Sequence, residues 1–385
     1  MIDLRLGDCL EVLKTLDSNS VDAVVTDPPA GIGFMGKTWD SSIGFREMLS
    51  SSLRECLRVA KPGSILLCWA LPRTSHWAGM AIEDAGWQIE DRITHVFGTG
   101  FPKHKSKLKP AAEDWWLARK PGPKWLGVDA CRVPHKTING GNLADNPHLR
   151  SHINGGNGGK IIATEKNRRV VVPDQDGRWP ANFALSHHDD CEQVGEKTLR
   201  GDRRGDPGGK RGSGFYSTGS DSGDSKPNAR VYGDETIDVW NCHPECPVRL
   251  LDEQSGDRPG CKSPSLAKCE SKYRPGQGAY QGQGPIYGDS GGASRFYYCS
   301  KSSKSDRAEF NTHPTVKSTN LMRWLCRLAC PSNGLILDPF MGSGSTGKAA
   351  VLEGFSFIGI EQDATYYQIA DRRISEVKSD IPLFA

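Results

Sequence analysis

The chain has 385 residues, a formal net charge of +3 and a hydrophobic fraction of 36%. This length can bury one large core or two ordinary ones, and the small net charge excludes nucleic-acid binding through overall basicity. No stretch has the apolar length of a membrane span, and residues 1–5 lack a signal-peptide core, so we expect a soluble cytoplasmic protein. The 44 glycines and 24 prolines predict long irregular segments.

The chain up to residue 97 alternates short strands with helices. Apolar runs bounded by turn residues predict strands at 4–6, 21–25, 64–70 and 87–97. Apolar side chains at helical spacing predict helices at 45–61 and 75–85. Such a βαβαβ series is typical of a parallel, doubly wound sheet. Asp8, just after the first strand, is suited to cap a helix.

An Asp-Pro-Pro corner, Asp27-Pro28-Pro29, follows the second predicted strand. Because proline lacks an N–H, the strand cannot continue, and Asp27 is held at the carboxyl edge of the sheet, where open α/β folds bind ligands. The Asp27 carboxylate and the Pro28 carbonyl would be two adjacent acceptors, suited to both hydrogens of an exocyclic amino group. The same residues also form an ordinary turn after a strand, and this motif alone does not separate the two interpretations.

Residues 98–125 combine basic and aromatic side chains. The residues concerned are Lys103, Lys105, Lys107, Lys109, Arg119, Lys120 and Lys124, interleaved with Phe101, Trp115, Trp116 and Trp125. Basic side chains neutralise phosphates and aromatic rings stack on exposed bases, so the stretch is a candidate DNA-facing strip. The alternative is a solvated basic loop whose tryptophans belong to the core.

The segment from about 126 to 311 loses hydrophobic periodicity and is rich in Gly, Ser, Asp and Arg. Such a composition buries little apolar surface, and parts of it are expected to be mobile until a partner orders them. Two firmer stretches, 170–185 and 237–251, each border cysteines.

Those borders predict a structural zinc site. The candidate ligands are His187 or His188, Cys191, Cys242 and Cys246. Histidine nitrogen and cysteine sulfur are the usual ligands of tetrahedral zinc, which stabilises domains with small cores. Since the Cys-x-x-x-Cys spacing is looser than that of usual zinc knuckles, buried reduced thiols are the alternative.

A second motif lies near the end of the chain. A helix is predicted at 320–329, and a strand then runs into the glycine turn Gly342-Ser343-Gly344 and out along a helix at 345–352. The next predicted strand, 356–361, ends in Glu361, 19 positions after Gly342. Gly342 to Gly347 also fits G-x-G-x-x-G, so a dehydrogenase has to be considered, but Asp338-Pro339-Phe340 before the turn argues against a dinucleotide.

Together, the Asp27-Pro28-Pro29 corner and Asp338-Pro339-Phe340-Met341-Gly342-Ser343-Gly344-Ser345 resemble the motifs of beta-class DNA amino-methyltransferases of bacteria and phages. In that family the corner precedes the cofactor loop, which is the order found here. The resemblance covers about 1–125 and 311–385. It implies a Rossmann-like α/β core with a mixed seven-stranded sheet and a circularly permuted motif order. The catalytic half would be 1–125, the inserted irregular recognition domain 126–310, and the cofactor half 311–385.

The resemblance also implies site residues. Asp27, Pro28 and Pro29 would hold the target amino group. Ala30 stands where the family has a stacking aromatic, so Phe34 or Trp39 would supply that face. S-adenosylmethionine would contact Asp8 with its adenine amino group, Glu361 with its ribose and Asp338, Phe340, Gly342 and Gly344 with its methionine part. His313, Thr315 and Lys317 would complete the cofactor side. Lys103, Lys105, Lys107, Lys109 and Trp39 would contact DNA.

The implied function is S-adenosylmethionine-dependent methylation of double-stranded DNA at N6 of a flipped adenine. The enzyme would act in the cytoplasm of a bacterial or phage-infected cell, for example as part of a restriction-modification system. N4 of cytosine is the alternative. Further alternatives are a catalytically impaired DNA-binding protein, suggested by Ala30, and an RNA methyltransferase. A monomer or a homodimer is expected.

Overall fold

The computed structural model describes residues 1–33, 40–98, 100, 108–133, 178–199, 235–256, 291–301, 306 and 309–380. It also describes five short strands in the middle of the chain: β6 (His152–Ile153), β7 (Gly159–Ala163), β8 (Arg169–Pro173), β11 (Arg203–Arg204) and β12 (Arg230–Val231).

A nine-stranded mixed sheet forms the centre of the protein, in the order β1-β16-β15-β2-β3-β5-β4-β9-β14. Neighbours from β1 to β3 are parallel, β5 is antiparallel to both β3 and β4, and β9 and β14 are again parallel additions. The strands are β1 (Ile2–Leu6), β2 (Val21–Thr26), β3 (Ala60–Ala70), β4 (Gln88–Val96), β5 (Ala112–Arg119), β9 (Phe183–His187), β14 (Tyr298–Lys301), β15 (Leu335–Asp338) and β16 (Ser356–Glu361).

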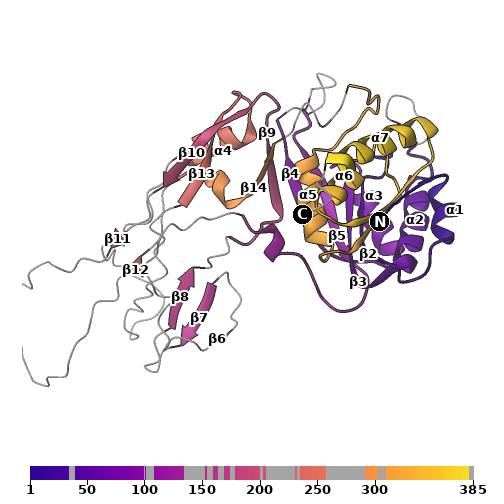
Figure 1. Cartoon of the computed structure of the whole chain (residues 1–385), viewed down its shortest axis with the longest axis horizontal. Helices are drawn as coiled ribbons and strands as arrows, with labels where there is room; N and C mark the ends of the chain where they lie inside the picture. The colour runs from indigo at the N-terminus through magenta and orange to yellow at the C-terminus, as the bar shows by residue number, and fades with distance from the viewer. Residues whose placement is uncertain are drawn as a thin grey trace, which may run out of the picture.

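Helices cover both faces of this sheet (Figure 1). Side chains alternate along regular strands, so Ala23 and Val25 of β2 enter one core while Val24 enters the other. The first core also contains side chains of α5, α6 and α7, and the second those of α1, α2 and α3. These helices are α1 (Cys9–Lys14), α2 (Phe45–Val59), α3 (Ser75–Asp84), α5 (Thr319–Ala329), α6 (Ser345–Leu352) and α7 (Ala364–Asp380). The result is a three-layer α/β fold.

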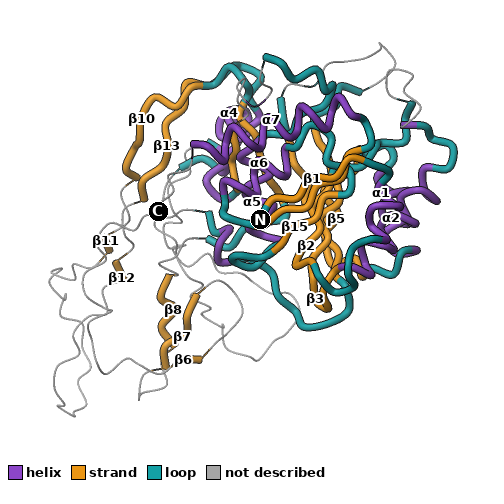
Figure 2. Tube along the Cα trace, turned by 45° about the vertical axis from the view of Figure 1, so that its right-hand side comes forward, coloured by secondary structure: helices purple, strands orange, loops and turns teal. Residues whose placement is uncertain are grey.

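The middle of the chain contributes directly to the sheet through β9 and β14. At this end of the molecule the antiparallel pair β10 (Glu192–Leu199) and β13 (Glu235–Asn241) leads into α4 (Pro247–Ser255) (Figure 2). Two 3₁₀ turns, η3 (Asp129–Cys131) and η5 (Ala293–Phe296), complete the assigned elements. The sheet therefore has nine strands where the resemblance implies seven, and the two further strands, β9 and β14, come from the segment expected to be an insertion. The proposed domain boundaries stay a prediction.

The predicted strands and helices are confirmed to within a few residues, and α6 and β16 have the predicted bounds. The mixed sheet that the resemblance implies is confirmed. The strands of the predicted βαβαβ series run in one direction, and β5, which the residue pattern did not predict, enters antiparallel between β3 and β4. Strand β5 lies within residues 98–125, which were interpreted either as a DNA-facing strip or as a basic loop with tryptophans in the core. Trp115 is fully buried and Trp116 is half-buried, with its indole N–H donating to Ser75, so both tryptophans are core residues. Within the described residues, no helix is both long and apolar enough to cross a membrane.

Because β5 is buried in the sheet, we expect Trp115 of this strand to contribute much more to stability than Trp125, which follows the strand. Trp115→Ala is expected to lower the free energy of unfolding by about 3–5 kcal/mol, because a fully buried indole leaves a cavity. Trp125→Ala should change it by less than about 0.5 kcal/mol, since Trp125 is 42% exposed. Urea unfolding measures both, and equal losses would contradict the placement of β5.

Candidate active site

The candidate site lies at the carboxyl edge of four adjacent parallel strands, β1, β16, β15 and β2. Asp8 follows β1, Glu361 ends β16, the Gly342 turn follows β15 and Asp27 follows β2. Parallel strands bring their carboxyl ends to one edge, which is where open α/β sheets bind ligands. The strand order therefore brings together the two motifs that are about 300 residues apart in the sequence.

Asp27 faces a cation. Its carboxylate Oδ2 lies 3.5 Å from Nζ of Lys317, and its side chain is 23% exposed. Burial has the largest effect on the pKa of Asp27 and raises it. The charge of Lys317 lowers this pKa and the charge of Glu113 raises it, and the resulting pKa is about 6. Asp27 is thus an ionised acceptor at neutral pH that can take up a proton under mildly acidic conditions.

Lys317 is shared between two carboxylates. Its Nζ lies 3.1 Å from Glu113 Oε2 and 3.9 Å from the centroid of the Trp69 ring. The Trp69 indole N–H donates to the same Glu113 oxygen at 2.7 Å. Although burial raises the pKa of Glu113, Lys317 and the hydrogen bonds from His95 and Trp69 outweigh it and hold that pKa well below its ordinary value. Glu113 therefore fixes the ammonium group that faces Asp27.

A row of polar side chains continues from Glu113 across the sheet. His95 Nδ1 lies 2.8 Å from Glu113 Oε1, and His95 Nε2 lies 2.7 Å from Ser186 Oγ. The Ser186 hydroxyl in turn bonds Ser300. These residues come from β5, β4, β9 and β14, and all four are buried. The row connects the two strands from the middle of the chain to the cation beside Asp27.

The loop after the corner is held by Asp40, which is 1% exposed. Its Oδ1 accepts the Gly31 N–H at 2.8 Å and its Oδ2 the Ile32 N–H at 3.2 Å. The Ala30 carbonyl accepts a hydrogen bond from Thr74 Oγ1 at 2.8 Å. These bonds fix the backbone that leaves Asp27. Phe34 and Trp39, the predicted stacking residues, lie outside the described residues.

The glycine turn after β15 is built around positive φ angles. Gly342 and Gly344 have φ of +53° and +78°, and a Cβ on Gly344 would lie 2.9 Å from Cβ of Ala370 in α7. The Glu361 carboxylate accepts the Gly342 N–H at 2.8 Å and the Asp363 N–H at 2.8 Å. Burial raises the pKa of Glu361. Glu361 thus lies beside the turn, as expected for the residue predicted to bind ribose, a role that stays a prediction.

Asp338 joins the two halves of the site. Its Oδ1 accepts from Thr26 Oγ1 at 2.7 Å, and its Oδ2 accepts from Thr346 Oγ1 at 2.6 Å. The Phe340 N–H donates to Oδ1 at 3.1 Å. Burial raises the pKa of Asp338 to about 7 against these hydrogen bonds. In this geometry Asp338 ties β2, β15 and α6 together and orients the turn that was expected to contact the methionine part.

The segment containing His313, Thr315 and Lys317 passes between the two halves. A Cβ added to Gly342 would lie 3.1 Å from His313 Nε2, so His313 packs on the glycine turn. His313 Nδ1 lies 2.6 Å from the Thr315 carbonyl oxygen. Four residues after His313, Lys317 reaches Asp27 instead of the turn. One short segment therefore contacts both the predicted cofactor loop and the predicted catalytic corner.

Asp8 caps α1: its Oδ1 accepts the Leu10 N–H at 2.9 Å and the Glu11 N–H at 3.2 Å. The capping interpretation is confirmed. Because a carboxylate has acceptor capacity on both oxygens, capping through Oδ1 is compatible with a contact to the cofactor's adenine through Oδ2, which stays a prediction.

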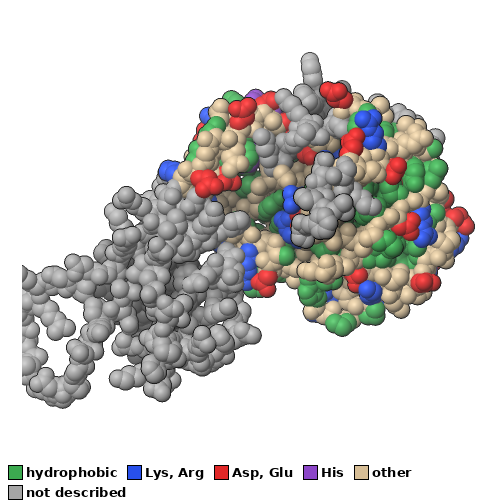
Figure 3. All heavy atoms as spheres, in the orientation of Figure 1, with side chains coloured by type: hydrophobic (Ala, Val, Ile, Leu, Met, Phe, Trp, Pro, Cys, Tyr) green, Lys and Arg blue, Asp and Glu red, His purple; other side chains and the backbone are tan. Residues whose placement is uncertain are grey.

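The predicted DNA-binding lysines are only partly described. Lys103, Lys105 and Lys107 lie outside the described residues, and Lys109 pairs with Glu245 at 3.2 Å. On the face drawn in Figure 3, the basic and acidic side chains of the described residues are interspersed. The DNA contacts of these lysines and of Trp39 stay a prediction.

The predicted zinc ligands come together. His187, Cys191, Cys242 and Cys246 have ligand atoms within 4.8 Å of one another, whereas His188 belongs to a separate group with Asp190 and His243. The structure thus selects His187 from the two candidate histidines.

The sequence reasoning missed Asp40, Glu113 and His95. Asp40 has no motif around it, and only its spacing of nine residues from Gly31 hinted at a contact. Glu113 and His95 lie opposite each other in the antiparallel pair of β5 and β4, a pairing that the sequence pattern did not predict.

Comparison with known proteins decides the family. A family model of N6/N4 DNA methylases matches residues 21–372, which is most of the chain. The chain belongs to this DNA methylase family. The matched range includes both motifs and the whole segment between them.

Three similar proteins illustrate the relationship. The type II methyltransferase M.HpaI of Haemophilus parainfluenzae is 31% identical over 142 residues, which are 35% of this chain and 45% of that protein. The DNA adenine methyltransferase YhdJ of Escherichia coli K12 is 36% identical over 66 residues, 17% of this chain and 22% of that protein. The alignments thus span less than half the length of these relatives. A crystal structure of an M1.HpyAVI–SAM complex aligns with a TM-score of 0.41 and 17% identity, covering 97% of this chain and 99% of that one.

The ion pair of Lys317 predicts a pH effect on the methyl transfer that the resemblance implies. Asp27 must be ionised to accept hydrogen bonds, so kcat/KM for methyl transfer should fall as the pH drops below about 6. Lys317→Met removes the charge that lowers the pKa of Asp27. In this variant the fall of kcat/KM at low pH should therefore begin at a pH about 1–3 units higher. Lys61→Met is the control, because Lys61 pairs with Asp22 at the opposite edge of the sheet. An acidic limb that stays in place in Lys317→Met would contradict the pairing.

The Asp40 clamp predicts a local defect. Asp40→Asn leaves one carbonyl acceptor for two backbone N–H groups, which should reduce the free energy of unfolding by about 1–3 kcal/mol and slow methyl transfer. Asp84→Asn, which removes a half-exposed partner of Arg46, serves as the control. Urea unfolding and single-turnover methylation check both variants, and wild-type values for Asp40→Asn would argue against the clamp.

Proposed function

We propose that this chain transfers a methyl group from S-adenosylmethionine to the exocyclic amino group of a base in double-stranded DNA, with N6 of adenine as the acceptor. The observation that carries the proposal is the position of Asp27 beside the glycine turn at one sheet edge, linked through the Thr26–Asp338 hydrogen bond. The methyl acceptor and the methyl donor need neighbouring sites, and the nearness of the two motifs at this edge supports such a pair.

Two features favour adenine over N4 of cytosine. The corner opens with Asp, and one relative that matches part of the chain is described as a DNA adenine methyltransferase. The family includes both amino positions in its description, so cytosine is the second candidate.

The amino nitrogen of a base is a weak nucleophile because its lone pair is delocalised into the ring. Asp27 and the Pro28 carbonyl would accept its two hydrogens and favour a tetrahedral nitrogen with an available lone pair. The cofactor supplies an electrophilic methyl group on a positively charged sulfur. As the nitrogen–carbon bond forms, the bond between the methyl carbon and sulfur would break, and its electron pair would stay on sulfur as a neutral thioether. One amino proton must also leave, and Asp27, with a pKa of about 6, would accept it.

The neighbours of Asp27 have distinct tasks in this scheme. Lys317 keeps the carboxylate ionised and oriented before the base arrives, and Trp69 and Glu113 hold Lys317 in place. Asp40 fixes the loop through which the flipped base would enter. Flipping a base out of the duplex costs a few kcal/mol, and a prearranged pocket offsets that cost.

The first experiment measures methyl transfer from isotope-labelled S-adenosylmethionine to unmodified duplex DNA of varied sequence, followed by mass spectrometry of the nucleosides. We expect N6-methyladenine, and a rate lower by about 10²- to 10⁴-fold in Asp27→Asn. Asp17→Asn, at an exposed position, is the matched control. N4-methylcytosine would instead select the second candidate.

The same assay tests the alternatives. Cofactor binding measured by calorimetry should persist in Asp27→Asn, since Asp338 and Glu361, and not Asp27, accept the backbone N–H groups of Phe340 and Gly342 at the glycine turn. Cofactor binding without any methylated nucleoside would overturn the proposal. It would favour a catalytically impaired DNA-binding protein, an alternative suggested by Ala30 at the position of the stacking aromatic. Methylation of structured RNA in preference to duplex DNA would overturn the choice of substrate.

A further inference from the structure

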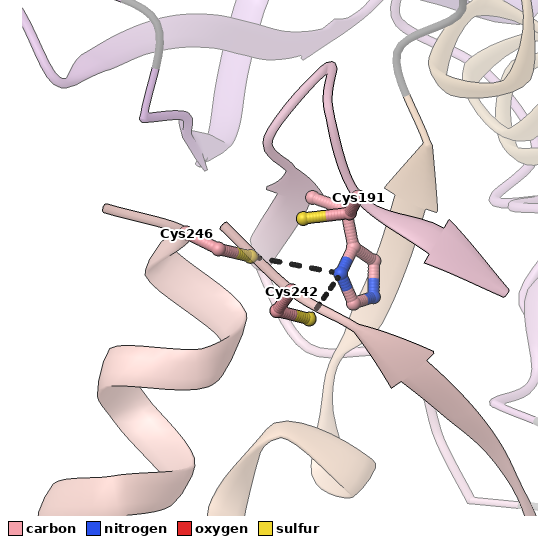
Figure 4. A group of neighbouring side chains, drawn as sticks. Cys191, Cys242 and Cys246 are labelled. Atoms are coloured by element: carbon pink, nitrogen blue, oxygen red, sulfur yellow. Dashed lines mark hydrogen bonds between the residues drawn. The ribbon is translucent and has the colours of Figure 1, made fainter. Parts of the chain in front are cut away.

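Four side chains with nitrogen and sulfur donors gather where the middle of the chain meets the central sheet. Figure 4 shows the thiols of Cys191, Cys242 and Cys246 around an imidazole nitrogen, which belongs to His187. His187 Nδ1 lies 3.5 Å from the Cys242 sulfur and 3.6 Å from the Cys246 sulfur. His187, Cys191 and Cys246 are buried and Cys242 is half-buried.

These separations match the edges of a tetrahedral metal site. Zinc binds thiolate sulfur at about 2.3 Å and imidazole nitrogen at about 2.1 Å, so a tetrahedral angle separates nitrogen from sulfur by about 3.6 Å. The two measured nitrogen–sulfur distances agree with that value. All four donor atoms lie within 4.8 Å of one another, which is close enough for one ion to contact them all.

The fold explains why residues so far apart in sequence converge. In the β10–β13 pair, Glu192 lies opposite Asn241, so Cys191 and Cys242 flank the same end of the pair. A turn closed by the hydrogen bond from Cys246 N–H to the His243 carbonyl brings the third thiol back. His187 ends β9, and Cys246 is the N-cap of α4, where the helix dipole favours a thiolate.

Neighbouring groups support the donors. The His243 N–H donates to the Cys191 sulfur at 3.3 Å, the kind of hydrogen bond that stabilises a thiolate ligand. The His187 ring stacks on Trp240 with centroids 4.1 Å apart, which fixes its orientation. Cys299 lies in the same apolar cluster, but its thiol lies 3.6 Å from the Ser294 carbonyl oxygen. The candidate ligand group therefore contains His187, Cys191, Cys242 and Cys246 but not Cys299.

We propose that His187, Cys191, Cys242 and Cys246 bind one structural Zn²⁺ ion. Three thiolates and one imidazole are a closed, four-ligand set, which is typical of structural zinc and leaves no position for a substrate. Soft sulfur donors in tetrahedral geometry select zinc over magnesium or calcium, which prefer oxygen ligands. The inference is independent of the methylation reaction.

The metal has a clear structural task. The buried apolar cluster around β9 and α4 contains Leu185, Cys191, Cys246 and Val248, and two of these are proposed ligands. So small a core stabilises a domain poorly without a metal or another cross-link. The ion would join β9, β10, β13 and α4, and it would anchor the strand whose Ser186 bonds His95.

The full chain is purified under reducing conditions without added metal, and its zinc content is measured by elemental mass spectrometry. We expect about one zinc ion per chain. Cys191→Ser and Cys246→Ser should lose most of it, and Cys299→Ser, a cysteine of the same cluster, should keep it. His187→Ala should weaken retention more than His188→Ala, which alters the adjacent histidine.

Cobalt provides a second measurement that does not depend on the variants. Replacing zinc by Co²⁺ in the wild-type chain should give the visible absorption and sulfur-to-cobalt charge transfer of tetrahedral thiolate sites. Chelation should lower the unfolding temperature of the wild-type chain. A wild-type chain that contains no zinc and shows no tetrahedral cobalt spectrum overturns the proposal, as does equal zinc loss in Cys299→Ser.

Discussion

The ion pair between Asp27 and Lys317 is the constraint on which the candidate site depends. A carboxylate at the edge of a sheet is costly to bury, and burial raises the pKa of Asp27. Lys317 offsets that cost, but a half-buried ammonium itself needs fixed partners. Glu113 and Trp69 supply them, and His95 and Ser186 fix Glu113 in turn. The position of one acceptor group is thus set by side chains from four strands and one loop.

A second interaction closes the fold around this site. The motif order of the chain separates the corner from the glycine turn, yet Thr26 and Asp338, 312 positions apart, share a buried hydrogen bond. This bond joins the ends of β2 and β15, so the two halves cannot move apart without breaking a hydrogen bond to a buried carboxylate. The segment from His313 to Lys317 adds a second connection over the same edge. Membership of the DNA methylase family accounts for both motifs.

The sequence predicted the parts with strong local periodicity and left out those that depend on strand pairing. Helix α6 and strand β16 were predicted to the residue, because a glycine turn and apolar runs mark their ends. Strand β5 was not predicted, since its buried tryptophans stand among lysines and its antiparallel pairing is a property of the whole sheet. For the same reason Glu113 and His95 were missed, and the ion pair of Lys317 with Asp27 was not predicted. The expected cofactor contact of Lys317 stays a prediction. The cysteine cluster was predicted from spacing, but the choice between His187 and His188 needed the end of β9.

The most direct test of this account is the pKa of Asp27 itself. Carboxyl-labelled aspartate can be incorporated into the full chain and titrated by ¹³C NMR, with Asp27→Asn used to assign the signal. The account predicts a pKa of about 6, because burial raises it and Lys317 only partly offsets that effect. A titration at the ordinary value of 3.8 would show a solvated carboxylate outside the charge network and would contradict the account.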